Sequence, residues 1–425
     1  MSSSWRPWAR RLGSFGTAQI GTQILGLLAG ILVARLLSVE EYAYYALAIA
    51  FLTSINVASE SGLSSQVVAI SGRRMPDVTG FGSLFRTATR YRRRVASLFS
   101  FFGAISLFLL LLLNHATIAT ASLMTLLVVG CIFASVTVSL RSAALTVLYH
   151  YRPVQYANLG AASARLAGAA LLFPFGSLGA ILPLAATWLA SMGQGLVLRR
   201  AMERQIDLTD TGGHPQDAVE LRRAMSRLLP VNLILVAQSQ GVSMLLGALG
   251  ATVVLAQVNA VSRYTLVFGF VSAIVVTVLG PALARSRLTR RILFGRYLSL
   301  VGLTIAVLAV LLLAMEVFAP FLLGLLGSKY SGLGFEYTIL NIGGAVGAVA
   351  ATCTGFNLAR GWTSGSWLMF PATGVWLLLG LVTLDVTTSA GASFFIATSY
   401  LPTLATAGLQ ALLGFRNSKE TYSPQ

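Results

Sequence analysis

Four arginines lie within or at the end of apolar stretches, and they are the residues best suited to holding an anion. Arg165 and Arg263 each lie about eleven residues inside such a stretch, which is about 16 Å along a helix. Arg141 lies nearer the end of its stretch, and Arg35 ends the first one. A charge at membrane depth costs roughly 2.5–3.5 kcal/mol, so it usually faces a cavity or a partner. These arginines predict a basic cavity for an anionic substrate; the alternative is a structural role, in which they bind helix-end carbonyls.

Glu60 is the one acidic residue clearly inside an apolar stretch. It could carry a coupling proton, or it could pair with an arginine and stay ionised. Its predicted position is in the cytoplasmic half of the membrane, near Arg73 and Arg74, where water and positive charge stabilise a carboxylate. This position favours a role in gating or ion pairing.

Uncharged polar side chains add to both halves of the chain. The predicted cavity-lining amides are Gln19, Gln23, Gln238, Gln240 and Asn259. Hydrogen bonding between membrane helices is the alternative role for such residues.

The elements that position these residues must be membrane helices. Apolar types make up 56% of the 425 residues and charged types only 10%, whereas soluble domains carry about 25% charge. The sequence predicts an all-α polytopic membrane protein with about 12 transmembrane helices. The predicted spans are 13–34, 42–70, 95–113, 117–140, 154–174, 177–198, 228–248, 252–282, 296–314, 335–356, 365–384 and 391–413.

The longest polar stretch divides these spans into two groups of six. We therefore predict an N-terminal six-helix lobe at 1–198, a cytoplasmic linker at 199–227 and a C-terminal six-helix lobe at 228–425, around a central cavity. Each half begins with a glutamine-bearing span and a tight outer hairpin, at 37–40 and 249–252. Residue identity between the halves is poor, so a duplication rests on topology alone.

Basic residues gather on one predicted side of the membrane. With the N-terminus inside, the inner side holds 25 of the 30 lysines and arginines, and the outer side only Arg35 and Lys329. This asymmetry predicts that both termini are cytoplasmic. It also explains the net charge of +17 without nucleic acid as a partner.

The inner segment at 72–94 has an amphipathic pattern. Phe81, Leu84, Phe85 and Ala88 recur at helical spacing among arginines. This pattern is typical of an interfacial helix on anionic membrane lipids. A solvated basic loop that only sets topology is the alternative.

The sequence predicts neither an enzyme nor a cofactor or metal site. It contains no phosphate-binding P-loop, no Gly-x-Ser-x-Gly and no His-Glu-x-x-His. Cys131 and Cys353 are far apart in apolar stretches, which indicates small buried hydrophobic residues. We therefore predict no catalytic residues.

Two N-terminal motifs resemble a known transporter family. The stretch QIGTQIL at 19–25, followed by ILVARLLSVEEY at 31–42, and the stretch ESGLS at 60–64 resemble the polysaccharide (O-antigen-type) flippases of the multidrug/oligosaccharidyl-lipid/polysaccharide exporter superfamily. The chain departs from the family pattern at Ala43, where glycine is frequent, and at Glu60, where aspartate is usual. The motifs cover roughly the first 70 residues, and the rest agrees in span number and in the central linker.

The resemblance implies a function in surface polysaccharide assembly at the bacterial cytoplasmic (inner) membrane. It implies export of an undecaprenyl-diphosphate-linked oligosaccharide by alternating access, coupled to an H⁺ or Na⁺ gradient. It also implies an arginine-bearing cavity, to which Arg35 carries over by motif, and a polysaccharide polymerase or ligase complex as a partner. The alternatives are a drug or metabolite antiporter of the same superfamily, a lipid II flippase, and a non-transporting scaffold for polysaccharide assembly.

Overall fold

The chain divides into two units built from helices. The computed structural model describes residues 5–74, 80–148, 150–205, 215–285 and 289–417, and these ranges contain helices and turns but no strand. Unit 1 covers Met1–Ala256 and unit 2 covers Gln257–Gln425. The fold class predicted from the sequence is thus confirmed as all-helical with two lobes.

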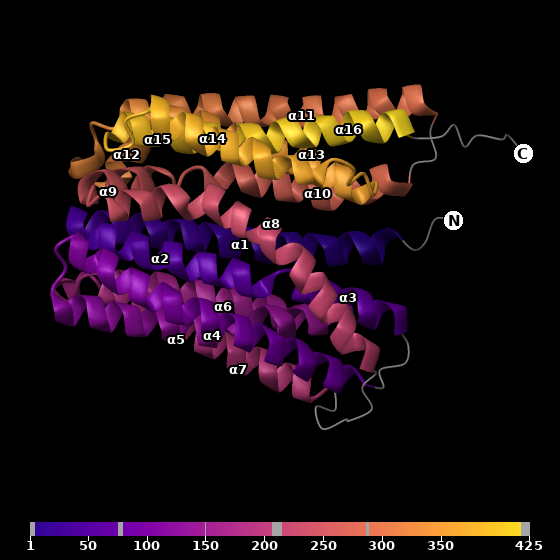
Figure 1. The fold of residues 1–425 in the computed structure, drawn as a ribbon, viewed down its shortest axis with the longest axis horizontal. Helices are drawn as coiled ribbons and strands as arrows, with labels where there is room; N and C mark the ends of the chain where they lie inside the picture. The colour runs from indigo at the N-terminus through magenta and orange to yellow at the C-terminus, as the bar shows by residue number, and fades with distance from the viewer. Residues whose placement is uncertain (1–4, 75–79, 149, 206–214, 286–288, 418–425) are drawn as a thin grey trace, which may run out of the picture. The chain divides into compact units, whose positions relative to one another are not determined.

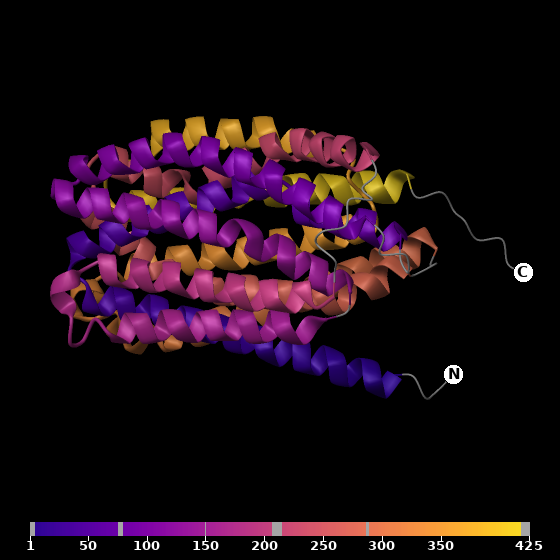
Figure 2. The same ribbon diagram turned by 90° about the horizontal axis from the view of Figure 1, so that it is seen from below.

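The long helices of unit 1 run side by side, and α8 crosses them obliquely towards α3 (Figure 1 and Figure 2). The helix α5 packs against α4 and α7, and α6 packs against α1 and α7. The elements are α1 (Trp5–Leu36), α2 (Val39–Glu60), α3 (Leu63–Arg74), α4 (Phe81–Leu113), α5 (Ile118–Val147), α6 (Tyr151–Ala170), η1 (Gly176–Leu178), α7 (Ile181–Glu203) and α8 (Pro215–Ala248).

Unit 2 is organised around α13, which packs against α10, α11, α15 and α16. The helix α9 begins in unit 1 and ends in unit 2. The remaining elements are α9 (Thr252–Val261), α10 (Leu266–Arg285), α11 (Arg290–Val317), α12 (Ala319–Leu326), η2 (Ser328–Tyr330), α13 (Gly334–Ala359), η3 (Ser366–Leu368), α14 (Met369–Thr383), α15 (Ser389–Thr398) and α16 (Leu401–Asn417).

The helix α8 groups with unit 1 by its contacts with α2, α3 and α4. The described parts of the predicted linker are mostly the end of α7 and the start of α8. The predicted six-helix lobes at 1–198 and 228–425, separated by a linker at 199–227, stay a prediction.

The number of spans is close to the predicted twelve. Within the described residues, ten helices are long and apolar enough to cross a membrane, or eleven if the bent pair α9–α10 is one span. The predicted span at 154–174 is not among them. Its helix, α6, contains Arg152, Asn158 and Arg165, and these side chains lower its hydropathy.

Two predicted spans are broken helices. The span at 42–70 is interrupted after Glu60, where α2 ends and α3 follows. The span at 252–282 bends by 41° between α9 and α10. Here the backbone N–H groups of residues 263–268 donate to carbonyls three residues earlier, so the chain is tighter than an α-helix at this bend.

Both predicted hairpins are tight turns between helices. At the first, Ser38 is the N-cap of α2, and its hydroxyl accepts a hydrogen bond from the Glu41 N–H at 3.2 Å. At the second, Gly250 has a φ of 68°, which a residue without a Cβ adopts at little cost. The helices at the first turn pack mainly against other partners, α1 against α6 and α2 against α4, α5 and α8.

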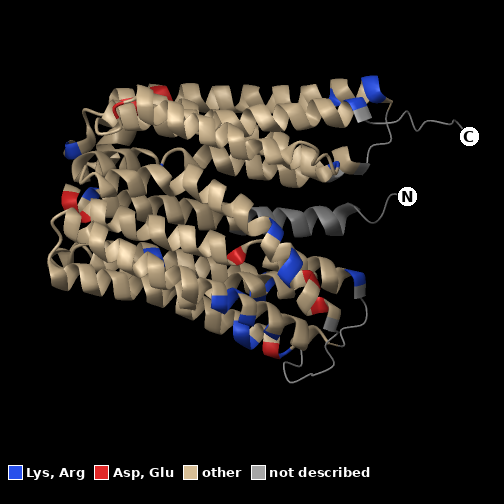
Figure 3. Cartoon of the chain, in the orientation of Figure 1, with Lys and Arg blue, Asp and Glu red and all other residues tan. Residues whose placement is uncertain are grey.

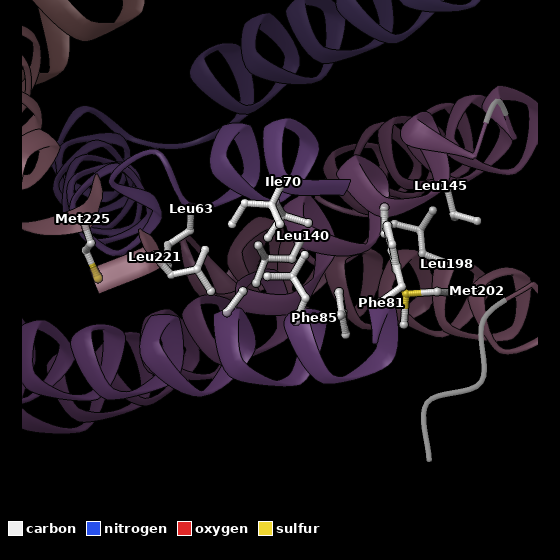
Figure 4. Close-up of a cluster of buried hydrophobic side chains, with 14 of the residues drawn as sticks. Leu63, Ile70, Phe81, Phe85, Leu140, Leu145, Leu198, Met202, Leu221 and Met225 are labelled. Atoms are coloured by element: carbon white, nitrogen blue, oxygen red, sulfur yellow. The ribbon is translucent and has the colours of Figure 1, made fainter. Parts of the chain in front are cut away.

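A packed apolar cluster closes one end of unit 1 (Figure 4). It joins α3, α5, α7 and α8 around Phe81, Leu84, Phe85 and Ala88 of α4, all of which are buried. The amphipathic helix predicted at 72–94 is therefore present from Phe81, but its apolar face packs against protein. The expectation that this face lies on lipid is wrong, because neighbouring helices cover it.

Asn114 joins the other end of α4 to the turn before α9. Its side-chain amide donates to the Gly247 carbonyl at 2.7 Å, and its side-chain oxygen accepts from the Thr252 hydroxyl at 2.7 Å. Its backbone carbonyl accepts from the Tyr44 hydroxyl at 2.9 Å. The Asn114 side chain therefore holds the turn between α8 and α9 against the end of α4.

We expect Asn114→Ala to lower the stability of the protein by about 1–3 kcal/mol. The substitution removes the hydrogen bond from the Asn114 amide to the Gly247 carbonyl and the one from the Thr252 hydroxyl to the Asn114 side chain, and each such bond contributes about 0.5–1.5 kcal/mol. The measurement is thermal unfolding in detergent, with Ser122→Ala, an exposed position on α5, as the control. Equal melting temperatures for the two variants would contradict a pinning role.

Candidate functional site

Glu60 lies at a short interruption between two helices, α2 and α3. The helix α2 ends at this residue, and Ser61 (φ 32°) and Gly62 (φ 77°) are left-handed before α3 begins. A Cβ on Gly62 would also collide with Leu228 of α8. The break brings the Glu60 carboxylate to the first turn of α3, where it accepts the Ser64 N–H at 2.8 Å. A carboxylate at a helix N-terminus satisfies a free N–H and interacts favourably with the helix dipole.

Arg92 of α4 neutralises Glu60. Its Nη1 lies 3.0 Å from Glu60 Oε2, and only 3% of its side chain is exposed, against 27% for Glu60. Ser139 of α5 donates to the same carboxylate oxygen at 3.0 Å and also contacts Arg92. The Val136 carbonyl accepts from Arg92 at 2.7 Å. Glu60 thus forms an ion pair with Arg92 and not with Arg73, and its role in gating stays a prediction.

The sequence interpretation missed Arg92 because three other arginines flank it, at 90, 93 and 94. It assigned all four to an inner connection. In the structure, Ala88, Arg92, Ala96 and Ser100 follow one another at intervals of four along the buried face of α4. The signal was present, because Arg92 continues the apolar face that begins at Phe81.

A second pair joins α3 to α8. Arg73 Nη2 lies 2.6 Å from Glu220 Oε2, and Gln66 donates to the same oxygen at 3.4 Å. Both charged side chains are substantially exposed, so this pair contributes little to stability. It does show that Arg73 is engaged away from Glu60.

Polar side chains continue from Glu60 along α5. Cys131, Ser135 and Ser139 are four residues apart, so they lie on one face over about 12 Å. Ser135 donates to the Asn56 side-chain oxygen at 2.7 Å, one turn before Glu60 on α2. We call Asn56, Glu60, Cys131, Ser135 and Ser139 the polar ladder.

Arg165 lies beside the other end of this ladder. Among the groups within electrostatic range of its guanidinium are Tyr45 and Cys131. The side chain is half-buried, and its Nε is fully buried with no hydrogen-bond partner among the described residues. It also forms no salt bridge within the described part of the chain. Among the described residues, Arg165 is thus a half-buried cation without a carboxylate partner.

The other three predicted arginines lie in different surroundings. Arg141 donates to the Gly195 carbonyl at 2.7 Å, and its electrostatic neighbours include Arg93 and Arg199. Arg35 is exposed in the last turn of α1. Arg263 is half-buried in the bend between α9 and α10, in unit 2.

The predicted amides differ in exposure. Gln19 and Gln23 are exposed on α1, whereas Gln238 is buried and Gln240 half-buried on α8. Asn259 is half-buried on α9. The four glutamines belong to unit 1 and Asn259 to unit 2.

Solved structures share this fold, although no family model and no curated protein match the chain. A multidrug resistance MATE family transporter of the MOP superfamily, in an inward-facing conformation, aligns with a TM-score of 0.73 and 14% identity. That alignment covers 94% of this chain and 96% of the transporter.

Two further structures agree. The lipid II flippase MurJ aligns with a TM-score of 0.70 and 12% identity over 95% of this chain and 89% of its own. A mutant of the MATE transporter VcmN of Vibrio cholerae aligns with a TM-score of 0.58 and 16% identity over 97% of this chain and 98% of its own. The chain therefore shares the fold of these transporters.

Proposed function

We propose that the chain is a flippase that moves an undecaprenyl-diphosphate-linked oligosaccharide across the bacterial cytoplasmic membrane by ion-coupled alternating access. The transporter fold and the N-terminal motifs support an exporter. The observation that carries the choice of an anionic substrate is Arg165, a half-buried cation beside the polar ladder with no carboxylate partner among the described residues.

A diphosphate needs such a group to cross a membrane. The attraction between opposite charges is stronger in a medium of low dielectric constant than in water. Guanidinium also binds phosphate oxygens with two parallel hydrogen bonds. Arg165 would therefore lower the free-energy cost of bringing the diphosphate to membrane depth. The hydroxyls of the polar ladder would offer hydrogen bonds along its path.

The remaining predicted residues take supporting roles in this proposal. Arg35 would add positive charge in unit 1 and Arg263 in unit 2. Glu60, held by Arg92, would act as a gate at the α2–α3 break. The amides Gln19, Gln23, Gln238, Gln240 and Asn259 would contact the sugars or the carrier.

Two other substrates remain as alternatives. A drug or metabolite antiporter is suggested by the likeness to the multidrug transporter, and a lipid II flippase by the likeness to MurJ. A cationic drug fits poorly beside Arg165, because like charges repel at low dielectric. Lipid II shares the diphosphate with the proposed substrate, so only the glycan separates these two.

Reconstituted liposomes test the proposal. The purified chain is expected to move a fluorescent undecaprenyl-diphosphate oligosaccharide between leaflets, faster with an ion gradient than without one. The same carrier bearing a lipid II headgroup, and a cationic dye, are the comparison substrates. Transport of the dye alone would support the antiporter, and transport of lipid II alone would support the lipid II flippase.

The proposed orientation places both termini in the cytoplasm, and labelling with a membrane-impermeant thiol reagent tests it. Both native cysteines are buried, so their background should be low. We expect Gln205→Cys and Ser418→Cys to react only after the inner side is opened, and Ser331→Cys to react in intact cells. Reaction of either of the first two variants in intact cells would overturn the orientation.

A further inference from the structure

Three neighbouring helices of unit 1 carry an arginine towards the same end. On α5, Arg141 follows Leu140 and interrupts an apolar stretch that continues to Val147, and on α7 Leu198 is followed by Arg199. On α4, Arg93 precedes the apolar part. Because α5 packs against both α4 and α7, the three arginines lie on neighbouring helices. Figure 3 shows basic residues gathered at this end of unit 1.

These arginines are close enough to influence one another. The charges that act on Arg141 are those of Arg199, Arg93 and Glu203. Arg199 donates to Glu203 at 2.6 Å. One of the three positive charges is thus neutralised, and an excess of two remains among these four groups. Like charges held together destabilise each other unless an anion lies between them.

The hydrogen-bonding capacity of the cluster is not used up. Arg141 donates one N–H to the Gly195 carbonyl, while its Nε is buried and has no partner among the described residues. Arg93 and Arg199 are exposed. A ligand that approaches from outside the helices can therefore reach the guanidinium groups of Arg93 and Arg199.

The surface beside the cluster is apolar. About two turns further along α4, Phe101 is 63% exposed. On α7, Leu196 and Val197 are also exposed. A ligand with a phosphate at the arginines and hydrocarbon chains along these residues would match both parts of the surface.

We propose that Arg93, Arg141 and Arg199 bind the phosphate of an anionic phospholipid headgroup. The boundary between apolar and basic residues lies where headgroups lie, and guanidinium forms two parallel hydrogen bonds with phosphate oxygens. The site is separate from the proposed substrate path, because Arg165 lies on α6 beside Tyr45 and Cys131. It gives Arg141 a lipid ligand in place of the substrate predicted for it.

Native mass spectrometry of the purified full chain with phosphatidylglycerol or phosphatidylcholine tests the site. We expect tighter retention of phosphatidylglycerol by the native chain. Each arginine replaced by glutamine should weaken this retention by roughly fivefold, since one basic residue near an anionic surface contributes about that much. The triple variant Arg93→Gln, Arg141→Gln, Arg199→Gln should therefore lose about 100-fold.

Matched charge removal elsewhere is the control. The variant Arg222→Gln, Arg223→Gln, Arg227→Gln loses three exposed arginines of α8 and should retain the lipid. Arg93→Gln alone serves if the triple variant does not fold, because Arg93 is exposed. Equal lipid retention by the cluster variant and the control would overturn the proposal. So would equal retention of phosphatidylcholine, or complete displacement of the lipid by millimolar inorganic phosphate.

Discussion

Arg165→Ala is expected to abolish transport of the diphosphate-linked substrate while the protein still inserts and folds. Truncating one partner of a buried, hydrogen-bonded charge pair costs about 2–5 kcal/mol, so the transport rate should fall by about 30-fold to several thousand-fold. Folding should be spared, because Arg165 forms no salt bridge within the described residues. The measurement is leaflet transfer in liposomes at matched protein amounts.

Two further variants make this result specific. Arg152→Ala removes an exposed arginine from the same helix and should transport normally. Arg165→Lys keeps the charge but loses the planar pair of donors, so partial activity would indicate a site that needs only charge. Normal transport by Arg165→Ala would show that this residue does not supply the charge that the substrate needs.

The second large effect is expected at the Glu60–Arg92 pair. Arg92→Ala should lower stability by about 3–5 kcal/mol, because it leaves the Glu60 carboxylate in a mostly buried position without its counter-charge. Adding Glu60→Gln should restore part of the loss, since an amide costs less to bury than a carboxylate. Thermal unfolding of the two single variants and the double variant gives the coupling between the residues.

The exposed neighbour Arg94 provides the control, and Arg94→Ala should leave the melting temperature unchanged. Additive losses of stability for the Arg92 and Glu60 variants would contradict a direct pair.

The transport rate of the Glu60→Gln variant tests the functional role of this acid. If transport became independent of the pH gradient while substrate still bound, Glu60 would carry the coupling proton and would not be a gating residue.

Long-range partners are the part of the site that could not be predicted. Asn56 and Ser135 are 79 residues apart in sequence, as are Glu60 and Ser139. Periodicity places each of these residues on a face of its own helix, but it does not say which helix lies opposite. Proximity in the sequence suggested the arginines at positions 73 and 74 as ion-pair partners of Glu60. In the structure its partner is Arg92, which belongs to another helix.

The hydropathy pattern also could not predict the break in the helix after Glu60. Residues 42–70 form an almost continuous apolar stretch, and such a stretch predicts one span. Ser61 and Gly62 nevertheless turn the chain, because glycine tolerates a left-handed conformation and α8 packs close to this point. The carboxylate therefore caps α3 at a helix end.

The sequence by itself determined that the chain is helical and membrane-embedded and where its tight hairpins lie. These properties follow from the length of apolar stretches and from local turn chemistry, which act over a few residues to about twenty. Only the tertiary structure decided which arginines share their surroundings with other charges and which apolar faces meet protein. Among the described residues, Arg92 is neutralised, Arg165 has no carboxylate partner, and the apolar face of α4 is covered. Burial and pairing of this kind depend on helices brought together from distant parts of the chain.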